Sequence, residues 1–432
     1  MTVRISSGRP CCSLGMRFAH RSLVVVAVLG LVAAACSSDT DAETDEPATS
    51  TASSQEPAST DTAADDGAPG GTGADDLTFT LADGYVAISI GEGVKPDLAL
   101  GPDGTAGIAY LVEDLNGFVA YAAAASEWTS ERIIDGYFYG PIGLAYDSDG
   151  VPNIAYHDHQ DSTFDEEKGD LTIATRQDST WMIEAIIGEG HDGWDSTIAI
   201  GADGVVRAAG IDPEQFGRTQ GVEYYELSGD AWEITEIGSG PVAYEFNVSL
   251  AVDPGGNPAL TYYDTTNADL KYAVRDNGGW SIETVDAEGD VGRYSSLAFT
   301  SDGTPHISYL RLDQSTAGTV RYATRDGDGW TAVDIDTLAD LRTGFTGARR
   351  VTAIAVGPDQ QPQIVYSDES VVKRAVADGG EWKAATLITA DDRALGQLVS
   401  FALSTDGTMH LAIFEVTSAS PLSGIVAYVT TR

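Results

Sequence analysis

The chain has 432 residues, of which 42% are hydrophobic, and its 66 Asp and Glu against 24 Lys and Arg give a formal net charge of −42. That hydrophobic fraction is enough for a large core, so the composition excludes a chain that is disordered throughout. The negative charge and the lack of a basic stripe argue against nucleic acid as a partner.

Residues 1–35 have the features of an export signal. They contain four Arg and no acidic residue, and they end in the apolar run 23–35. This run is shorter than the roughly 20 residues that span a bilayer. A basic start, a short apolar run and small residues at its end are typical of a secretory signal peptide. The sequence therefore predicts an exported protein, and Met16, which begins a compact signal of normal shape, is a second hypothesis for the true start.

Cys36 follows this run directly, and the stretch 32–36 (Val-Ala-Ala-Ala-Cys) resembles a bacterial lipobox. The resemblance implies that Cys36 becomes a lipid-modified N-terminus that anchors the protein to the outer face of the bacterial cell membrane; ordinary cleavage that leaves a free Cys36 is the alternative. Residues 36–76 are rich in Asp, Glu, Ser, Thr, Ala, Gly and Pro and contain no Lys, Arg or aromatic residue. Such a segment cannot bury enough apolar area to fold, so we expect a disordered tether.

From Leu77 onward one unit recurs seven times, with a period of about 50 residues. Each copy has an apolar-small-apolar triplet, a turn that usually contains Asp-Gly, and an apolar strand that usually ends in Tyr. Alternation with period two predicts β-strands, and Asp-Gly supplies the positive φ of a tight hairpin. Several short strands per copy predict that residues 77–432 form an all-β, seven-bladed β-propeller. The triplets begin at Leu98, Leu144, Ile198, Leu250, Leu297, Ile354 and Phe401.

Tryptophan opens the expected fourth strand of six copies, at Trp128, Trp181, Trp232, Trp280, Trp330 and Trp382. Because the residue recurs at one repeat position, we predict that these rings pack between blades. The seventh copy ends before a fourth strand. Residues 83–90 have the pattern of residues 278–285, with Tyr85 in the Trp position. The N-terminal strand is therefore predicted to complete the last blade and close the ring, which removes exposed sheet edges.

The repeat resembles that of secreted bacterial β-propellers, most closely in residues 249–280. The resemblance covers residues 77–432 and implies the fold without an activity, since propellers host many functions. The stretch 301–304 (Ser-Asp-Gly-Thr) lacks the Trp and the spacing of a sialidase box, and the stretch 147–150 (Asp-Ser-Asp-Gly) falls short of a calcium loop. We expect no cofactor, and a structural calcium ion stays open.

One face of such a propeller gathers the loops that join the second to the third strand and the fourth strand to the next blade. Aromatic, Arg, His and Asp side chains on that face suit carbohydrate or peptide recognition. For Trp194, stacking on a ligand and packing within its loop both stay open. The stretch 157–159 has the composition of a metal site, but successive residues of a strand face opposite sides, and solvated histidines are the simpler alternative. The candidate ligand-binding residues are Tyr139, His157, Asp158, His159, His191, Asp192, Trp194, Phe246, Arg293, Tyr294, Arg349, Arg350 and Arg393.

These features favour a lipid-anchored extracellular protein that binds a carbohydrate, peptide or protein ligand, rather than an enzyme. The first alternative is a sialidase-like hydrolase or lyase that acts on glycans with loop carboxylates and arginines. The second is a structural subunit of an envelope complex. We expect a monomer whose partners are the membrane, through the lipid, and an unknown ligand. The sequence contains no complete motif for phosphate binding or for a catalytic triad.

Overall fold

The computed structural model describes most of residues 77–432. Every regular element in the described ranges is a β-strand. A helix that could cross a membrane is not found among these residues. The predicted signal peptide, Cys36 and the tether lie outside the described residues and stay predictions. The described ranges are 77–112, 117–124, 127–158, 169–186, 193–212, 221–239, 248–276, 279–314, 317–327, 329–338, 341, 350–368, 370–396, 399–419 and 422–432.

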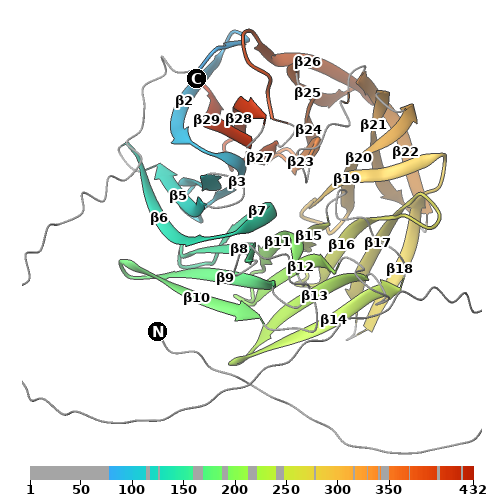
Figure 1. The fold of residues 1–432 in the computed structure, drawn as a ribbon. Helices are drawn as coiled ribbons and strands as arrows, with labels where there is room; N and C mark the ends of the chain where they lie inside the picture. Colours follow the sequence, from blue (N-terminus) through green and yellow to red (C-terminus); the bar gives the residue numbers. More distant parts are fainter. Residues whose placement is uncertain are drawn as a thin grey trace, which may run out of the picture. The chain divides into compact units, whose positions relative to one another are not determined.

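The strands form seven antiparallel sheets that follow one another in a ring, with the first strand of each sheet innermost (Figure 1). This arrangement confirms the predicted all-β, seven-bladed propeller. Blade 1 contains β3 (Val94–Leu100), β4 (Ala106–Val112), β5 (Gly117–Ala124) and β6 (Trp128–Gly136); blade 2 contains β7 (Phe138–Tyr146), β8 (Pro152–Asp158), β9 (Asp170–Gln177) and β10 (Thr180–Ile186); blade 3 contains β11 (Trp194–Ile200), β12 (Val206–Asp212), β13 (Gly221–Ser228) and β14 (Ala231–Ser239).

The other four blades repeat this order. Blade 4 contains β15 (Ser249–Val252), β16 (Pro258–Asp264), β17 (Asp269–Asp276) and β18 (Gly279–Asp286); blade 5 contains β19 (Asp290–Phe299), β20 (Pro305–Gln314), β21 (Ala317–Asp326) and β22 (Gly329–Leu338). Blade 6 contains β23 (Thr352–Val356), β24 (Pro362–Ser367), β25 (Val371–Asp378) and β26 (Glu381–Ala390); blade 7 contains β27 (Ser400–Leu403), β28 (Met409–Ala419), β29 (Leu422–Thr431) and the N-terminal β2 (Tyr85–Glu92).

The last blade is completed by the start of the propeller, as predicted. β2 pairs antiparallel with β29 from Tyr85 opposite Thr431 to Glu92 opposite Ile425, with Ile88 opposite Tyr428. The two ends of the propeller therefore share one sheet, and the chain runs directly from β2 into β3 of blade 1 (Figure 1). Closure of this kind couples the stability of the first and the last blade.

A short strand before β2 was not expected. β1 (Phe79–Leu81) pairs with β26 and adds a fifth strand to the outer edge of blade 6. Thr78, just before it, donates two hydrogen bonds to Glu415 Oε1, from its backbone N at 2.9 Å and from Oγ1 at 2.8 Å. Glu415 is fully buried in blade 7. The N-terminal strands therefore hold both of the last two blades.

Aromatic pairs connect neighbouring blades. A Tyr on the third strand of one blade packs on the Trp that opens the fourth strand of the next, which confirms that these rings form core between blades. Each such pair adds about 0.5–1.5 kcal/mol beyond the area it buries. The pairs, with centroid distances, are Tyr121–Trp181 at 5.4 Å, Tyr224–Trp280 at 4.9 Å, Tyr272–Trp330 at 5.1 Å, Tyr322–Trp382 at 4.9 Å and Tyr428–Trp128 at 4.8 Å.

Hydrogen bonds of one kind connect the inner strands at four blade boundaries. In each, the side chain of the residue that precedes a triplet accepts a hydrogen bond from the first N–H of the triplet in the next blade. Blade 2 has Gly143 at this position, where a Cβ would lie 3.0 Å from the Ile198 backbone nitrogen, so the close approach of β7 and β11 requires Gly. The bonds run from Leu98 N to Ser400 Oγ (2.9 Å), Leu144 N to Asp97 Oδ2 (2.8 Å), Leu297 N to Ser249 Oγ (3.1 Å) and Ile354 N to Ser296 Oγ (3.2 Å).

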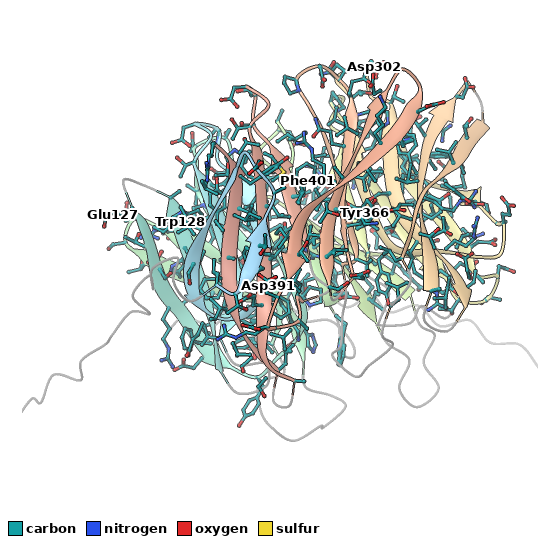
Figure 2. All side chains as sticks on the ribbon, turned by 90° about the horizontal axis from the view of Figure 1, so that it is seen from above. Glu127, Trp128, Asp302, Tyr366, Asp391 and Phe401 are labelled. Atoms are coloured by element: carbon teal, nitrogen blue, oxygen red, sulfur yellow. The ribbon has the colours of Figure 1, made fainter. Side chains whose placement is uncertain are left out.

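The antiparallel order gives the propeller two distinct faces. Tight turns between first and second strands lie on one face, as at Asp302. The connections from fourth strands lie on the other, as at Asp391 after β26. Figure 2 shows Asp302 at the upper edge and Asp391 in the lower half. We call the face that carries Asp391 the loop-bearing face.

Candidate functional site

The structure describes the side chains of seven of the predicted ligand-binding residues. Tyr139 belongs to β7, but its side chain is outside the description. His159, His191, Asp192, Phe246 and Arg349 lie outside the described residues, so their part in a site stays a prediction. The seven are His157, Asp158, Trp194, Arg293, Tyr294, Arg350 and Arg393. Their contacts fall into four groups.

The first place is the boundary between blades 2 and 3. His157 is fully buried at the end of β8, and its ring lies 5.3 Å from the ring of Trp194, with 42° between the planes. Asp158, the next residue, is half-buried, as expected for successive residues of a strand, which face opposite sides. Trp194 therefore packs on His157. Within the described ranges, no group of three or more His, Cys, Asp or Glu is placed to hold a metal ion.

Arg350 lies at the second place, near the ring axis. Its Nη1 is 2.8 Å from Asp97 Oδ1 of blade 1, and its Nη2 donates to the Ser196 carbonyl of blade 3 at 3.2 Å. Ser400 of blade 7 donates to the same Asp97 oxygen at 2.8 Å. Arg350 precedes β23 of blade 6, so one guanidinium group connects blades on different sides of the ring. This position explains Arg350 as a contact within the protein.

The third place joins blade 7 to the N-terminal segment. Arg393 Nη1 lies 3.4 Å from Oε2 of the buried Glu415, whose other oxygen accepts the two bonds from Thr78. A buried carboxylate needs such partners, because an unpaired charge in the interior is very costly. Arg393 and Glu415 therefore fasten the start of the propeller.

The fourth place is a network at the boundary of blades 4 and 5 that contains Arg293. We call it the blade 4–5 cluster; its residues are Tyr263, Asp286, Glu288, Asp290, Arg293, Tyr309, Arg311, Asp313, Thr319, Arg321 and Asp334. They come from the ends of β16 and β18, the start of β19, and strands β20, β21 and β22. The connection from β18 to β19 is short, and Gly289 makes it with a φ of 92°. It brings Asp286, Glu288 and Asp290 onto the loop-bearing face.

Tyr263, Asp290 and Arg293 form the inner half of the cluster. Arg293 Nε and Nη2 donate to the two oxygens of Asp290 at 2.9 and 2.8 Å, and Tyr263 donates to Asp290 Oδ1 at 2.8 Å. The guanidinium carbon of Arg293 lies 4.7 Å from the centre of the Tyr263 ring. Burial, followed by the hydrogen bond to Asp290, raises the pKa of Tyr263 to about 12. Tyr294, the next residue, is buried and has a φ of 54°.

Asp286, Tyr309 and Arg321 form the outer half. Asp286 Oδ2 accepts from the Tyr309 hydroxyl at 2.5 Å and from Arg321 Nη1 at 2.6 Å. The side chains of Arg321 and Asp286 are only 6% and 7% exposed. Burial raises the pKa of the Tyr309 hydroxyl, and its hydrogen bond to Asp286 raises it further. Arg321 Nη2 also reaches Glu288 at 3.3 Å, and its Nε lies 2.8 Å from Asp334.

Arg311 connects the cluster to the outer strand of blade 5. It donates through Nε to Asp313 at 2.9 Å and through Nη1 and Nη2 to the two oxygens of Asp334, each at 3.2 Å. Burial on its own raises the pKa of Asp313, but hydrogen bonds from Thr319 and Arg311 outweigh it and lower that pKa. Asp334 and Glu288 remain 52% and 79% exposed. The cluster thus presents carboxylate oxygens and a Tyr–Arg–Asp arrangement, which can hold sugar hydroxyl groups.

Sequence reasoning named Arg293, Tyr294 and the loop carboxylate of Asp313 but missed the rest of the cluster. One signal was the residue six positions after the blade Trp, which is Ile134 in blade 1 and Ile388 in blade 6 but Asp286 in blade 4 and Asp336 in blade 5. Asp336 accepts hydrogen bonds from Tyr366 at 2.8 Å and Lys373 at 2.7 Å, as Asp286 does from Tyr309 and Arg321. An acidic residue at this repeat position is a reason to look for a polar partner in the next blade.

No family model and no curated protein sequence matches the chain. Among solved structures, the chain is similar to a polysaccharide lyase of family PL25, an ulvanlyase. The unliganded lyase is 13% identical, with a TM-score of 0.57 over 79% of this chain and 94% of that one. The lyase bound to -[GlcA(1-4)Rha3S]- is 13% identical, with a TM-score of 0.56 over 81% and 95%. An α-L-arabinanase of Penicillium chrysogenum is 15% identical, with a TM-score of 0.44 over 68% and 93%. At these identities the likeness shows the propeller fold alone.

Proposed function

We propose that the protein acts on a glycan at the loop-bearing face, as a lyase or a hydrolase, with the blade 4–5 cluster as its site. The observation that carries this proposal is the cluster itself. Charged and phenolic side chains gather there at positions where the boundary between blades 6 and 7 has Ile388 and Ile413. The likeness of the fold to a polysaccharide lyase supports the choice of glycans among ligand classes.

In this proposal the inner half of the cluster meets the sugar. Asp290 is 31% exposed and is oriented by Arg293 and Tyr263, so its oxygens accept hydrogen bonds from sugar hydroxyl groups. The outer half holds the connection that carries Glu288 and Asp290. Asp286, Tyr309 and Arg321 are therefore positioning residues.

Incubation of the full chain with a panel of polysaccharides tests this function. A lyase gives an unsaturated sugar that absorbs ultraviolet light, and a hydrolase gives new reducing ends without that absorbance. Arg293→Ala should lower turnover by about 10²-fold or more, because it releases both Asp290 and Tyr263. The matched control is Arg132→Ala, since Arg132 pairs with Asp135 three residues later and lies 4.4 Å from the centre of the Phe118 ring on exposed outer strands of blade 1. Equal losses in both variants would contradict the site.

Glycan binding without cleavage is the second candidate, and one observation favours it. A general acid or base works best with a pKa near the operating pH. In the cluster, the pKa of Tyr263 is raised to about 12 and that of Asp313 is lowered, so both lie away from neutrality. Retention on immobilised polysaccharide without any product would support this candidate over turnover.

We propose, on the sequence alone, that the protein works outside the cell and is attached to the membrane through lipid on Cys36. A glycan of the cell surface or the surroundings is then within reach. Transfer to a soluble fraction after Cys36→Ser, with unchanged thermal unfolding, tests this location.

A further inference from the structure

We infer that the glycan accepted by the blade 4–5 cluster is uncharged. This inference rests on the proposed function, and it separates the chain from the fold relative that was solved with a sulfated, uronate-containing glycan. Two observations support it: the arginines of the cluster are paired with carboxylates of the protein, and the charge that stays exposed is negative.

Each arginine of the cluster is neutralised by a carboxylate of the protein. Arg293 makes a two-pronged pair with Asp290, and Arg311 makes another with Asp334. Arg321 is paired with Asp286 inside the protein. A sugar carboxylate or sulfate that used these groups would have to displace a carboxylate already held at 2.6–3.2 Å. Paired guanidinium groups therefore offer no free anion site.

The charge that remains exposed is negative. The cluster contains five carboxylates, on Asp286, Glu288, Asp290, Asp313 and Asp334, against three guanidinium groups. Its most exposed charged groups are carboxylates, with Glu288 at 79% and Asp334 at 52%. The chain as a whole carries a formal charge of −42. A polyanion that approaches this face therefore meets repulsion at long and at short range.

An uncharged glycan meets no such cost. Its hydroxyl groups donate to the excess carboxylate oxygens, which are strong acceptors when ionised. The chemistry of the substrate also decides whether it can be cleaved by elimination or only by hydrolysis. Elimination needs a proton made acidic by a neighbouring carboxyl group, and a neutral glycan without uronic acid or its esters has none. Cleavage of such a glycan is hydrolysis: the glycosidic C–O bond breaks, the hydroxyl of water joins the anomeric carbon, and its proton goes to the leaving oxygen.

Matched pairs of polymers test the inference. The full chain is titrated with neutral arabinan, galactan and β-glucan and with the carboxymethylated form of each. At low salt, about 0.01 M, we expect the neutral polymer to bind at least about tenfold more tightly than its anionic form. This difference in affinity between the neutral and the anionic polymer should shrink at about 1 M salt, where the Debye length falls from about 30 Å to about 3 Å. Where product forms, it should have new reducing ends and no unsaturated sugar.

A charge variant ties the effect to the cluster. Glu288→Gln should lower the affinity ratio of neutral to anionic polymer at low salt about two- to threefold, because it removes the most exposed negative charge of the cluster. Glu381→Gln removes an exposed charge at the start of β26, away from the cluster, and should leave this ratio unchanged. Tighter binding of the anionic polymer at low salt, or release of unsaturated sugar, would overturn the inference while the proposed function stands. Failure to bind any polymer of either kind would overturn the proposed function, and the inference with it.

Discussion

The boundary between blades 4 and 5 and the boundary between blades 6 and 7 use the same positions for opposite chemistry. Asp286 and Tyr309 meet at the first, where Arg321 joins them, whereas Ile388 and Ile413 lie in one hydrophobic cluster at the second. All of these side chains are buried. Replacing a buried ion pair by apolar residues is often neutral or stabilising, so packing alone does not favour the ionic version. The boundary between blades 5 and 6 has a group of the first kind, in which Asp336 accepts hydrogen bonds from Tyr366 and Lys373. The comparison teaches that the repeat accommodates either chemistry at these positions.

The largest expected effect concerns closure of the ring at blades 6 and 7. Deletion of residues 77–91 removes β1 and nearly all of β2, which leaves β29 and β26 with open edges. We expect loss of the cooperative unfolding transition in circular dichroism. Deletion of residues 77–82 alone removes only β1 and the Thr78 contacts, and it should keep a transition at a lower temperature. Intact melting after the longer deletion would contradict closure.

The next largest effect is expected on the free energy of unfolding, when the ionic group at the boundary between blades 4 and 5 is changed. Asp286→Ala leaves Arg321 and Tyr309 buried without their shared partner, and we expect a loss of about 3–5 kcal/mol in the free energy of unfolding. Replacing Asp286 and Tyr309 by Ile and Arg321 by Leu makes this boundary apolar, and stability should return to within about 1–2 kcal/mol of wild type or exceed it. Denaturant titration measures both. If the triple variant were as unstable as Asp286→Ala, the comparison between the two boundaries would fail.

A smaller effect is expected on the pH dependence of stability, from one histidine in blade 5 and one in blade 7. His306 Nδ1 lies 2.6 Å from the Tyr322 hydroxyl, and His410 Nδ1 lies 2.6 Å from that of Tyr428. Burial lowers the pKa of both histidines, against the opposing effect of Asp302 and Asp406. The unfolded chain therefore binds the proton more readily, and stability is lost as pH falls below about 6.5. His306→Gln with His410→Gln should flatten the decline in melting temperature between pH 7 and about pH 5. An unchanged decline would contradict this assignment.

The smallest effect on folding is expected at Cys36. Cys36→Ser should leave the melting temperature and both blade boundaries unchanged, because residue 36 lies before the propeller. It should also abolish metabolic labelling by a palmitate analogue. Continued labelling of the variant would show that Cys36 is not the lipidated residue.

The fold could be predicted because its signals are repeated. Seven triplets, six Trp at one position, and a missing strand at one end with a matching surplus at the other all indicate the closed ring. β1 could not be predicted, since three residues are too few to carry a strand pattern and its partner β26 lies more than 300 residues away. Strands this far apart in the sequence can pair only when the ring closes, and no local sequence pattern indicates that pairing.

The site was harder to predict because its residues come together from two blades, and one of them, Tyr309, is the Tyr that most copies of the repeat have. Arg293 was expected in a connection between strands, and it lies near the start of β19. Arg321 lies within β21, and its partner Asp286 is 35 residues earlier in another blade. Arg350 and Arg393 are in the expected connections, but both are bound by carboxylates of the protein, Asp97 and Glu415. Residue type and loop position do not show whether a charge is already paired.

Hydrogen exchange in the presence of ligand tests the central claim most directly. Amide exchange of the full chain is compared with and without a mixture of neutral arabino-, galacto- and gluco-oligosaccharides. The account predicts slower exchange in residues 286–293 and 309–321, with no change in the turn at residues 300–304 on the opposite face. Exchange that is unchanged in both segments of the blade 4–5 cluster, or slowed only at residues 300–304, would contradict it.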